Sequence, residues 1–147
     1  MEKEERAIMV TSDTHAACLW YVSWLSFASA IVGFMKCKSE IAIVPMAVCF
    51  TSLNYWRKPR YGSWERKLDL AVVIVGLSYQ SYRALLYENA ESYFTVLAVA
   101  LSCYPISLWA ARNNLNKTAT ALHIALHILA NGSNLVLYCG IKLLRVK

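Results

Sequence analysis

Charged residues are scarce in this chain: Asp, Glu, Lys and Arg make up 16% of its 147 residues, whereas soluble domains average about 25%. Glycine and proline are also few, at five and three residues, while apolar residues reach 58% and the mean hydropathy is +0.39. The scarcity of charge argues against a water-soluble domain, and the five Trp, nine Tyr and four Phe exclude an intrinsically disordered chain. We therefore expect one integral membrane domain over residues 1–147.

Sequence motifs for several large enzyme classes are missing. The chain contains no GxxxxGK[ST], GxGxxG, GxSxG or HExxH motif, which excludes P-loop nucleotide hydrolysis, dinucleotide redox chemistry and the common serine and zinc proteases. Its five Cys form no CxxC pair, so neither a disulfide framework nor a zinc knuckle is predicted. The N-terminal stretch is rich in Glu and has no apolar core, so we expect no cleaved signal peptide.

Five apolar segments approach the length of about 20 residues that a helix needs to cross about 30 Å of hydrocarbon. They are too long and too uniformly apolar for the alternating strands of a membrane barrel, and a helix satisfies its own backbone hydrogen bonds in lipid. The sequence thus predicts an all-α, multi-pass transmembrane bundle. The five predicted helices are 15–35, 41–56, 68–87, 93–111 and 118–141.

Positive charge is concentrated between the second and third segments. Residues 57–67 carry five Lys and Arg, and Arg112 and Lys117 flank the next connection on the same side. By the positive-inside rule, this side and the N-terminus face the cytoplasm. We interpret the net charge of +6 as a signal of topology and not as a nucleic-acid surface, and we take an endomembrane as the working location.

Polar residues recur along one face of the fifth predicted helix. Their spacings of three, four, four and three residues bring them to the same side of an α-helix. Because polar groups without hydrogen-bond partners are costly in lipid, this face should turn toward protein or a wet cavity. The five residues are Thr120, His123, His127, Asn131 and Asn134.

The third predicted helix has a similar face, formed by Asp69, Gly76, Gln80 and Arg83. Gly76 would allow a neighbouring helix to approach closely. Arg83 lies near the far end of this helix, where we expect it to reach the membrane surface or to pair with Glu88.

Ser52, Asp69, His123 and His127 are predicted to lie at one depth, near the cytoplasmic ends of three helices. Ionisable groups inside membrane spans are costly, so each is a hypothesis for a functional site. Two His at positions i and i+4 can bind one metal ion, and a carboxylate can join or orient the ligands. Bound zinc generates a nucleophilic water at neutral pH. We therefore name His123 and His127 as candidate zinc ligands, Asp69 as candidate general base and Ser52 as candidate oxyanion donor.

Three stretches resemble a known membrane superfamily. Residues 51–56 (TSLNYW), 66–71 (RKLDLA) and 123–132 (HIALHILANG) are similar to the second, third and last helices of the CREST superfamily, which includes alkaline ceramidases, haemolysin III-like proteins and the adiponectin and progestin receptors. The resemblance implies a helical bundle with a zinc site near the cytoplasmic side that hydrolyses an amide or ester bond in a lipid. It assigns Ser52 to the Ser of the SxxxH element, Asp69 to the Asp that holds the metal-bound water, and His123 and His127 to two of three zinc ligands.

Two features depart from that family pattern. Trp56 stands where the third zinc ligand is expected, and an indole cannot bind zinc. The family fold also has seven helices, whereas this sequence predicts five. Either Asn54, Asp69 or His15 completes the zinc ligands, or the chain keeps the scaffold without its chemistry.

Two other functions compete with a zinc-dependent hydrolase acting on a membrane lipid. A non-catalytic membrane subunit or assembly protein would use the polar faces for hydrogen bonds between helices, and its partners would be other subunits or further copies of the chain. A small channel or transporter would use the face from Thr120 to Asn134 as a wet interior.

Overall fold

The computed structural model of the protein describes residues 13–60 and 62–143. The N-terminal segment that is predicted to be cytoplasmic lies outside the described residues. Within them the chain folds into five helices and no strand, and an isolated bridge joins Tyr87 to Lys142. The helices are α1 (Asp13–Met35), α2 (Ser39–Trp56), α3 (Trp64–Ala84), α4 (Ala90–Arg112) and α5 (Asn116–Cys139). The all-α prediction is confirmed for this part of the chain.

Three of the described helices, α1, α4 and α5, are long and apolar enough to cross a membrane. The prediction of an integral membrane protein is therefore supported by these three. The α2 helix has 18 residues and includes Glu40 and Asn54, while α3 carries several charged residues in its first two turns. The polar residues of α2 lower its mean hydropathy, and α3 has too many charged residues, so length and composition alone do not mark these two helices as spans.

The start of α3 differs from the prediction, which placed it at residue 68. The helix begins at Trp64 because Ser63 caps it: its side chain accepts a hydrogen bond from the backbone N–H of Arg66 at 3.3 Å. The last part of the basic loop is thus helical, and Arg66 lies one turn before Asp69 on the same face. The helix also ends earlier than predicted, at Ala84.

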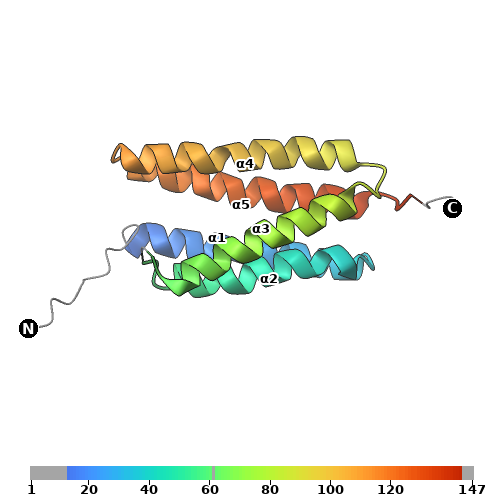
Figure 1. Cartoon of the computed structure of the whole chain (residues 1–147), viewed down its shortest axis with the longest axis horizontal. Helices are drawn as coiled ribbons and strands as arrows, with labels where there is room; N and C mark the ends of the chain where they lie inside the picture. Colours follow the sequence, from blue (N-terminus) through green and yellow to red (C-terminus); the bar gives the residue numbers. More distant parts are fainter. Residues whose placement is uncertain (1–12, 61, 144–147) are drawn as a thin grey trace, which may run out of the picture.

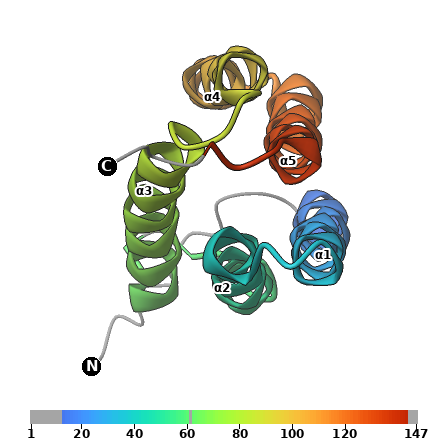
Figure 2. The ribbon, with the colours of Figure 1, turned by 90° about the vertical axis from the view of Figure 1, so that its right-hand side faces the viewer.

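The five helices run along the long axis of the molecule, with α3 inclined to the others (Figure 1). Viewed along that axis, they form a ring in chain order (Figure 2). Neighbours pack closely around the ring, most extensively α4 on α5, but α3 and α4 barely touch. The ring therefore has one weakly packed seam, between α3 and α4.

Two glycines allow the backbones of neighbouring helices to approach closely. A Cβ atom on Gly76 of α3 would lie 2.8 Å from Cγ1 of Val44 in α2, which agrees with the close approach predicted from the sequence. A Cβ atom on Gly33 of α1 would lie 2.7 Å from the Cβ of Ala42 in α2. Small residues at helix contacts are typical of membrane bundles.

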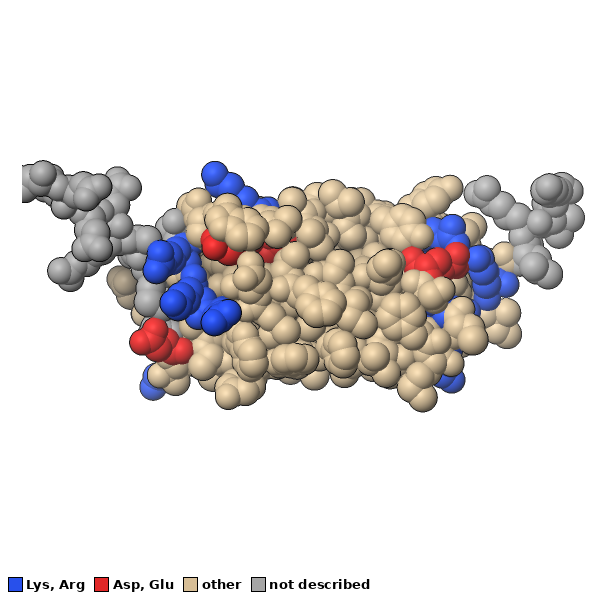
Figure 3. Space-filling view, turned by 90° about the horizontal axis from the view of Figure 1, so that it is seen from below, with Lys and Arg blue, Asp and Glu red and all other residues tan. Residues whose placement is uncertain are grey.

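Charged side chains gather at the two ends of the molecule, and the band between them is almost free of charge on the face seen in Figure 3. One end, which we call the basic end, holds the 57–67 connection, the starts of α1, α3 and α5 and the ends of α2 and α4. The opposite end, which we call the Glu40 end, holds the starts of α2 and α4. This distribution is the one expected for a bundle whose middle lies in hydrocarbon.

The Glu40 end is held together by ionic contacts that the sequence did not predict. Arg83 pairs with Glu40 of α2 and not with Glu88, which instead accepts a hydrogen bond from the backbone N–H of Ile141 at 3.0 Å. Lys142 also donates to Glu40, at 2.8 Å. The expected pairing of Arg83 with Glu88 is therefore wrong, because antiparallel packing of α2 and α3 brings the end of α3 beside the start of α2.

Candidate functional site

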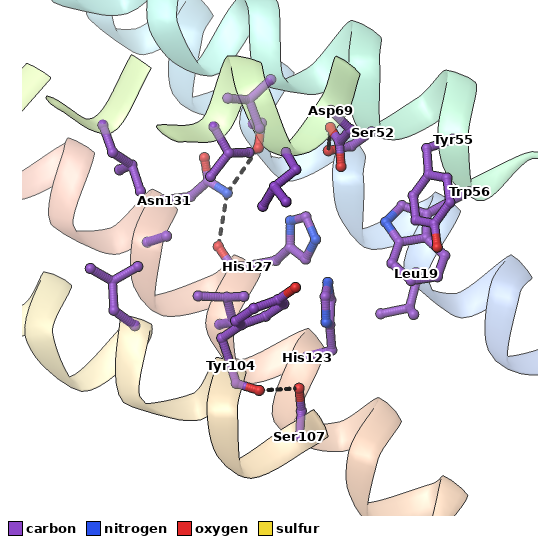
Figure 4. Close-up of a pocket in the computed structure, with 18 of the residues that line it drawn as sticks. Leu19, Ser52, Tyr55, Trp56, Asp69, Tyr104, Ser107, His123, His127 and Asn131 are labelled. Atoms are coloured by element: carbon purple, nitrogen blue, oxygen red, sulfur yellow. Dashed lines mark hydrogen bonds between the residues drawn. The ribbon is translucent and has the colours of Figure 1, made fainter. Parts of the chain in front are cut away.

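A cavity of about 510 Å³ lies inside the helix ring, and all five helices contribute to its wall (Figure 4). Along α5 it extends from Asn116 to Asn134, a rise of about 27 Å at 1.5 Å per residue. Its volume falls within the range of about 300–1,000 Å³ typical of small-molecule sites. The cavity is thus long, narrow and large enough for a ligand.

The polar face predicted on α5 lines this cavity along its whole length. Four of its residues are buried, and His123 is half-buried. The face is composed of Thr120, His123, His127, Asn131 and Asn134. The expectation that it turns toward the interior is confirmed.

Ser52 and Asp69 meet at the basic half of the cavity. The hydroxyl of Ser52 donates a hydrogen bond to Oδ1 of Asp69 at 2.8 Å, and the hydroxyl of Thr51 donates to the same oxygen at 2.7 Å. These two contacts fix the carboxylate between α2 and α3. Thr51 was not predicted as part of the site, although its position next to Ser52 in the sequence offered a signal.

The two candidate imidazoles lie on α5 and extend toward the side of the cavity that holds Ser52 and Asp69 (Figure 4). The ring centroids of His123 and His127 are 5.3 Å apart. His123 also meets the edge of Trp56, with centroids 5.2 Å apart, and lies 6.1 Å from the ring of Tyr104. Aromatic side chains therefore surround His123 on two sides.

Hydrogen bonds between helices mark the deeper half of the cavity. Asn131 donates to Oγ of Ser26 in α1 at 3.2 Å and to the carbonyl of His127 at 2.8 Å. Farther from the basic end, Gln80 of α3 donates to Oδ1 of Asn134 at 2.6 Å. This last bond joins α3 to α5 across the ring and satisfies two amides that would be costly if exposed to lipid.

The remaining wall is apolar and comes mainly from the two helices at the seam. Between Asp69 and Gln80, α3 presents four aliphatic side chains to the cavity, and α4 presents three leucines. Several of these side chains are also partly exposed on the outer surface. They are Leu70, Val73, Ile74 and Leu77 of α3, and Leu97, Leu101 and Leu108 of α4.

The residues present do not form the zinc site that the family resemblance implies. Within residues 13–60 and 62–143, no group of three or more His, Cys, Asp or Glu side chains could hold a metal ion. Asn54 is exposed, and neither it nor His15 lines the cavity. The described site therefore offers two imidazoles, one ligand fewer than a three-histidine centre needs.

Comparison with protein-family models, with curated proteins and with solved structures finds no match to this chain. Its function has to be inferred from the cavity itself. The cavity joins all four residues named from the sequence, Ser52, Asp69, His123 and His127, and adds Arg66 at its basic end. Arg66 was not predicted as a site residue, although it precedes Asp69 by three residues and so shares its helix face.

Proposed function

We propose that this chain is a five-span membrane protein that binds a single-chain membrane lipid inside its helix ring. The polar part of the lipid lies among Ser52, Asp69, His123 and His127, and its hydrocarbon chain lies along the aliphatic wall of α3 and α4. One observation carries this proposal: a single cavity is aliphatic over most of one wall and gathers its ionisable groups toward one end. This is the shape and polarity of an amphiphile.

The weak packing between α3 and α4 supports lateral entry of the ligand. Because these helices barely touch and their cavity-lining side chains also reach the outer surface, a lipid can pass from the bilayer into the ring without crossing water. The band between the two ends, almost free of charge on the face seen in Figure 3, supports five spans, with α2 crossing beside α1 and α3 beside α2. The basic end faces the cytoplasm by the positive-inside rule, and so does the N-terminus.

The side chains available as zinc ligands agree best with lipid binding without hydrolysis. A zinc-dependent hydrolase of this kind needs a third ligand, and Trp56 occupies its expected position. We therefore infer that the chain is a remote relative of the CREST superfamily that keeps the scaffold and the polar site but binds its lipid without cleaving it. The channel hypothesis receives less support, because the aliphatic wall of the cavity disfavours a continuous file of water.

Two tryptophan substitutions on α3 test lipid binding. Val73→Trp places a large side chain in the cavity, whereas Val75→Trp places it on the outer surface, where Val75 is 68% exposed. The full chain in phosphatidylcholine nanodiscs is titrated with 1-hexadecanol, and bound ligand is counted by native mass spectrometry. We expect one bound molecule per chain in the unsubstituted protein and in Val75→Trp, and none in Val73→Trp. Equal binding by both variants would overturn the proposal.

A further inference from the structure

The basic end of the cavity contains a cation whose position indicates the charge of the ligand. Arg66 is the one Lys or Arg among the described residues that line the cavity. It lies in the first turn of α3, lines the cavity and is half-buried, so its side chain is accessible both from the cavity and from the surface at this end. A guanidinium has five N–H donors arranged to bind phosphate or carboxylate oxygens.

The surroundings of Arg66 reinforce this positive charge. Four more cations of the same connection are exposed at this end, with Glu65 as the one acid between residues 57 and 67. They are Arg57, Lys58, Arg60 and Lys67. A cluster of this kind attracts anionic lipids of the cytoplasmic leaflet and raises their concentration at the mouth of the cavity.

Asp69 is bound by two hydroxyls of α2. It lies three residues farther along α3, about 4.5 Å deeper by helix rise, and its Oδ1 already accepts the hydroxyls of Thr51 and Ser52. The opposite end of the cavity offers only the neutral amides of Gln80 and Asn134, which bind each other. A charged headgroup therefore fits the basic end and a hydrocarbon chain fits the remainder.

We infer that the lipid in the cavity carries an anionic headgroup of the phosphate type, which Arg66 binds at the basic end. This inference rests on the proposed lipid binding and adds the charge of the ligand to it. The headgroup stays at the membrane surface, level with Arg66, while the linkage between headgroup and chain lies beside Asp69 and His123.

Two probes with the same hydrocarbon chain and different headgroups test the inference. Hexadecyl phosphate and 1-hexadecanol are titrated against the full chain in phosphatidylcholine nanodiscs, in the unsubstituted protein and in Arg66→Gln and Lys67→Gln. Lys67 is the matched control because it neighbours Arg66, carries the same charge, is exposed and does not line the cavity.

We expect the unsubstituted protein and Lys67→Gln to bind the phosphate about tenfold more tightly than the alcohol, the effect of one charge-assisted contact. Arg66→Gln should lose this preference and bind the alcohol as before, which also shows that it is folded. Equal affinity for both probes in the unsubstituted protein, or equal losses in the two variants, overturns the inference and leaves lipid binding intact. Failure of both probes to bind overturns the proposed function as well.

Discussion

The indole of Trp56 lies edge-on against the imidazole of His123, with ring centroids 5.2 Å apart and an angle of 76° between the planes. This contact joins the end of α2 to α5 at the position where the resemblance to the CREST superfamily expects a third zinc ligand. A side chain at residue 56 therefore reaches His123, but the indole that is present there cannot bind zinc.

Replacing Trp56 by His should create a zinc site. Zinc–nitrogen bonds of about 2.0–2.1 Å require the three imidazoles to converge, and the contacts of Trp56 with His123 and of His123 with His127 bring all three positions together. We expect close to one zinc per chain in Trp56→His after metal loading, measured by inductively coupled plasma mass spectrometry. The unsubstituted protein should bind well below one.

The matched control for this prediction is Trp56→His combined with His123→Ala, which should lose the zinc again. Stoichiometric zinc in the unsubstituted protein, lost in both His123→Ala and His127→Ala, would instead establish these histidines as zinc ligands and favour the zinc-dependent hydrolase. Absence of zinc from Trp56→His would argue against the CREST relationship.

Gly76 should be intolerant of even a methyl group. A Cβ atom there would lie 2.8 Å from Cγ1 of Val44, so Gly76→Ala must push α2 and α3 apart. We expect a loss of about 1–3 kcal/mol in the free energy of unfolding, the usual cost of overpacking. Gly132→Ala is the control, because a Cβ atom on Gly132 meets nothing within 4 Å, and alanine there should be neutral or stabilising. Equal unfolding curves in detergent for the two variants would contradict the close approach.

Acid should weaken the Glu40 end. Hydrogen bonds from Arg83 and then Lys142 lower the pKa of the Glu40 carboxyl from 4.5 to about 2; this residue lies in the first turn of α2, before the predicted span. Because the pKa is lowered on folding, the carboxylate stabilises the fold above pH 4.5 and this contribution disappears as the pH falls toward 2. The site is partly exposed, so we expect an effect of at most about 1 kcal/mol.

Glu40→Gln should remove this part of the pH dependence, measured as the shift of the thermal unfolding midpoint between neutral and acidic pH. The exposed Glu91 at the start of α4 provides the control substitution, Glu91→Gln, which should leave the dependence of the parent protein in place. If the two variants behave alike, the contacts of Glu40 with Arg83 and Lys142 do not contribute.

The sequence predicted the helices and the polar face of α5 because both depend on local periodicity. Apolar length marks a helix, and spacings of three and four residues from Thr120 to Asn134 determine which side chains share a face. The start of α3 was missed because hydropathy counts Glu65 and Lys67 as loop, whereas the cap on Ser63 makes them helical.

Features that depend on packing between distant segments could not be read from the sequence. Arg83 has Glu88 close by in sequence, yet it pairs with Glu40, 43 positions away, because two antiparallel helices meet there. The open seam between α3 and α4 likewise follows from the inclination of α3 and not from any residue pattern. Both features become visible only when the helices are arranged in space.

The orientation of the bundle can be tested with cysteines. Cys37 is exposed at the Glu40 end and Lys58 is exposed at the basic end. In sealed microsomes, whose cytoplasmic face is outward, a membrane-impermeant maleimide should label Lys58→Cys, introduced into a variant lacking the native cysteines. In a second variant, Cys37 is the one cysteine that is kept. It should react only after detergent is added. The reverse pattern would place the basic end in the lumen.

The most direct test of lipid binding inside the ring uses a photoactivatable single-chain lipid and identifies the residues to which it crosslinks. Leu77 and Leu101 line the cavity on α3 and α4, whereas Val75 and Val99 are 68% and 53% exposed and do not line it. After irradiation in nanodiscs and peptide mass spectrometry, our account predicts adducts at Leu77 and Leu101 that saturate near one per chain and are displaced by unlabelled hexadecyl phosphate. Adducts confined to Val75, Val99 and other outward positions, rising without saturation, would contradict it.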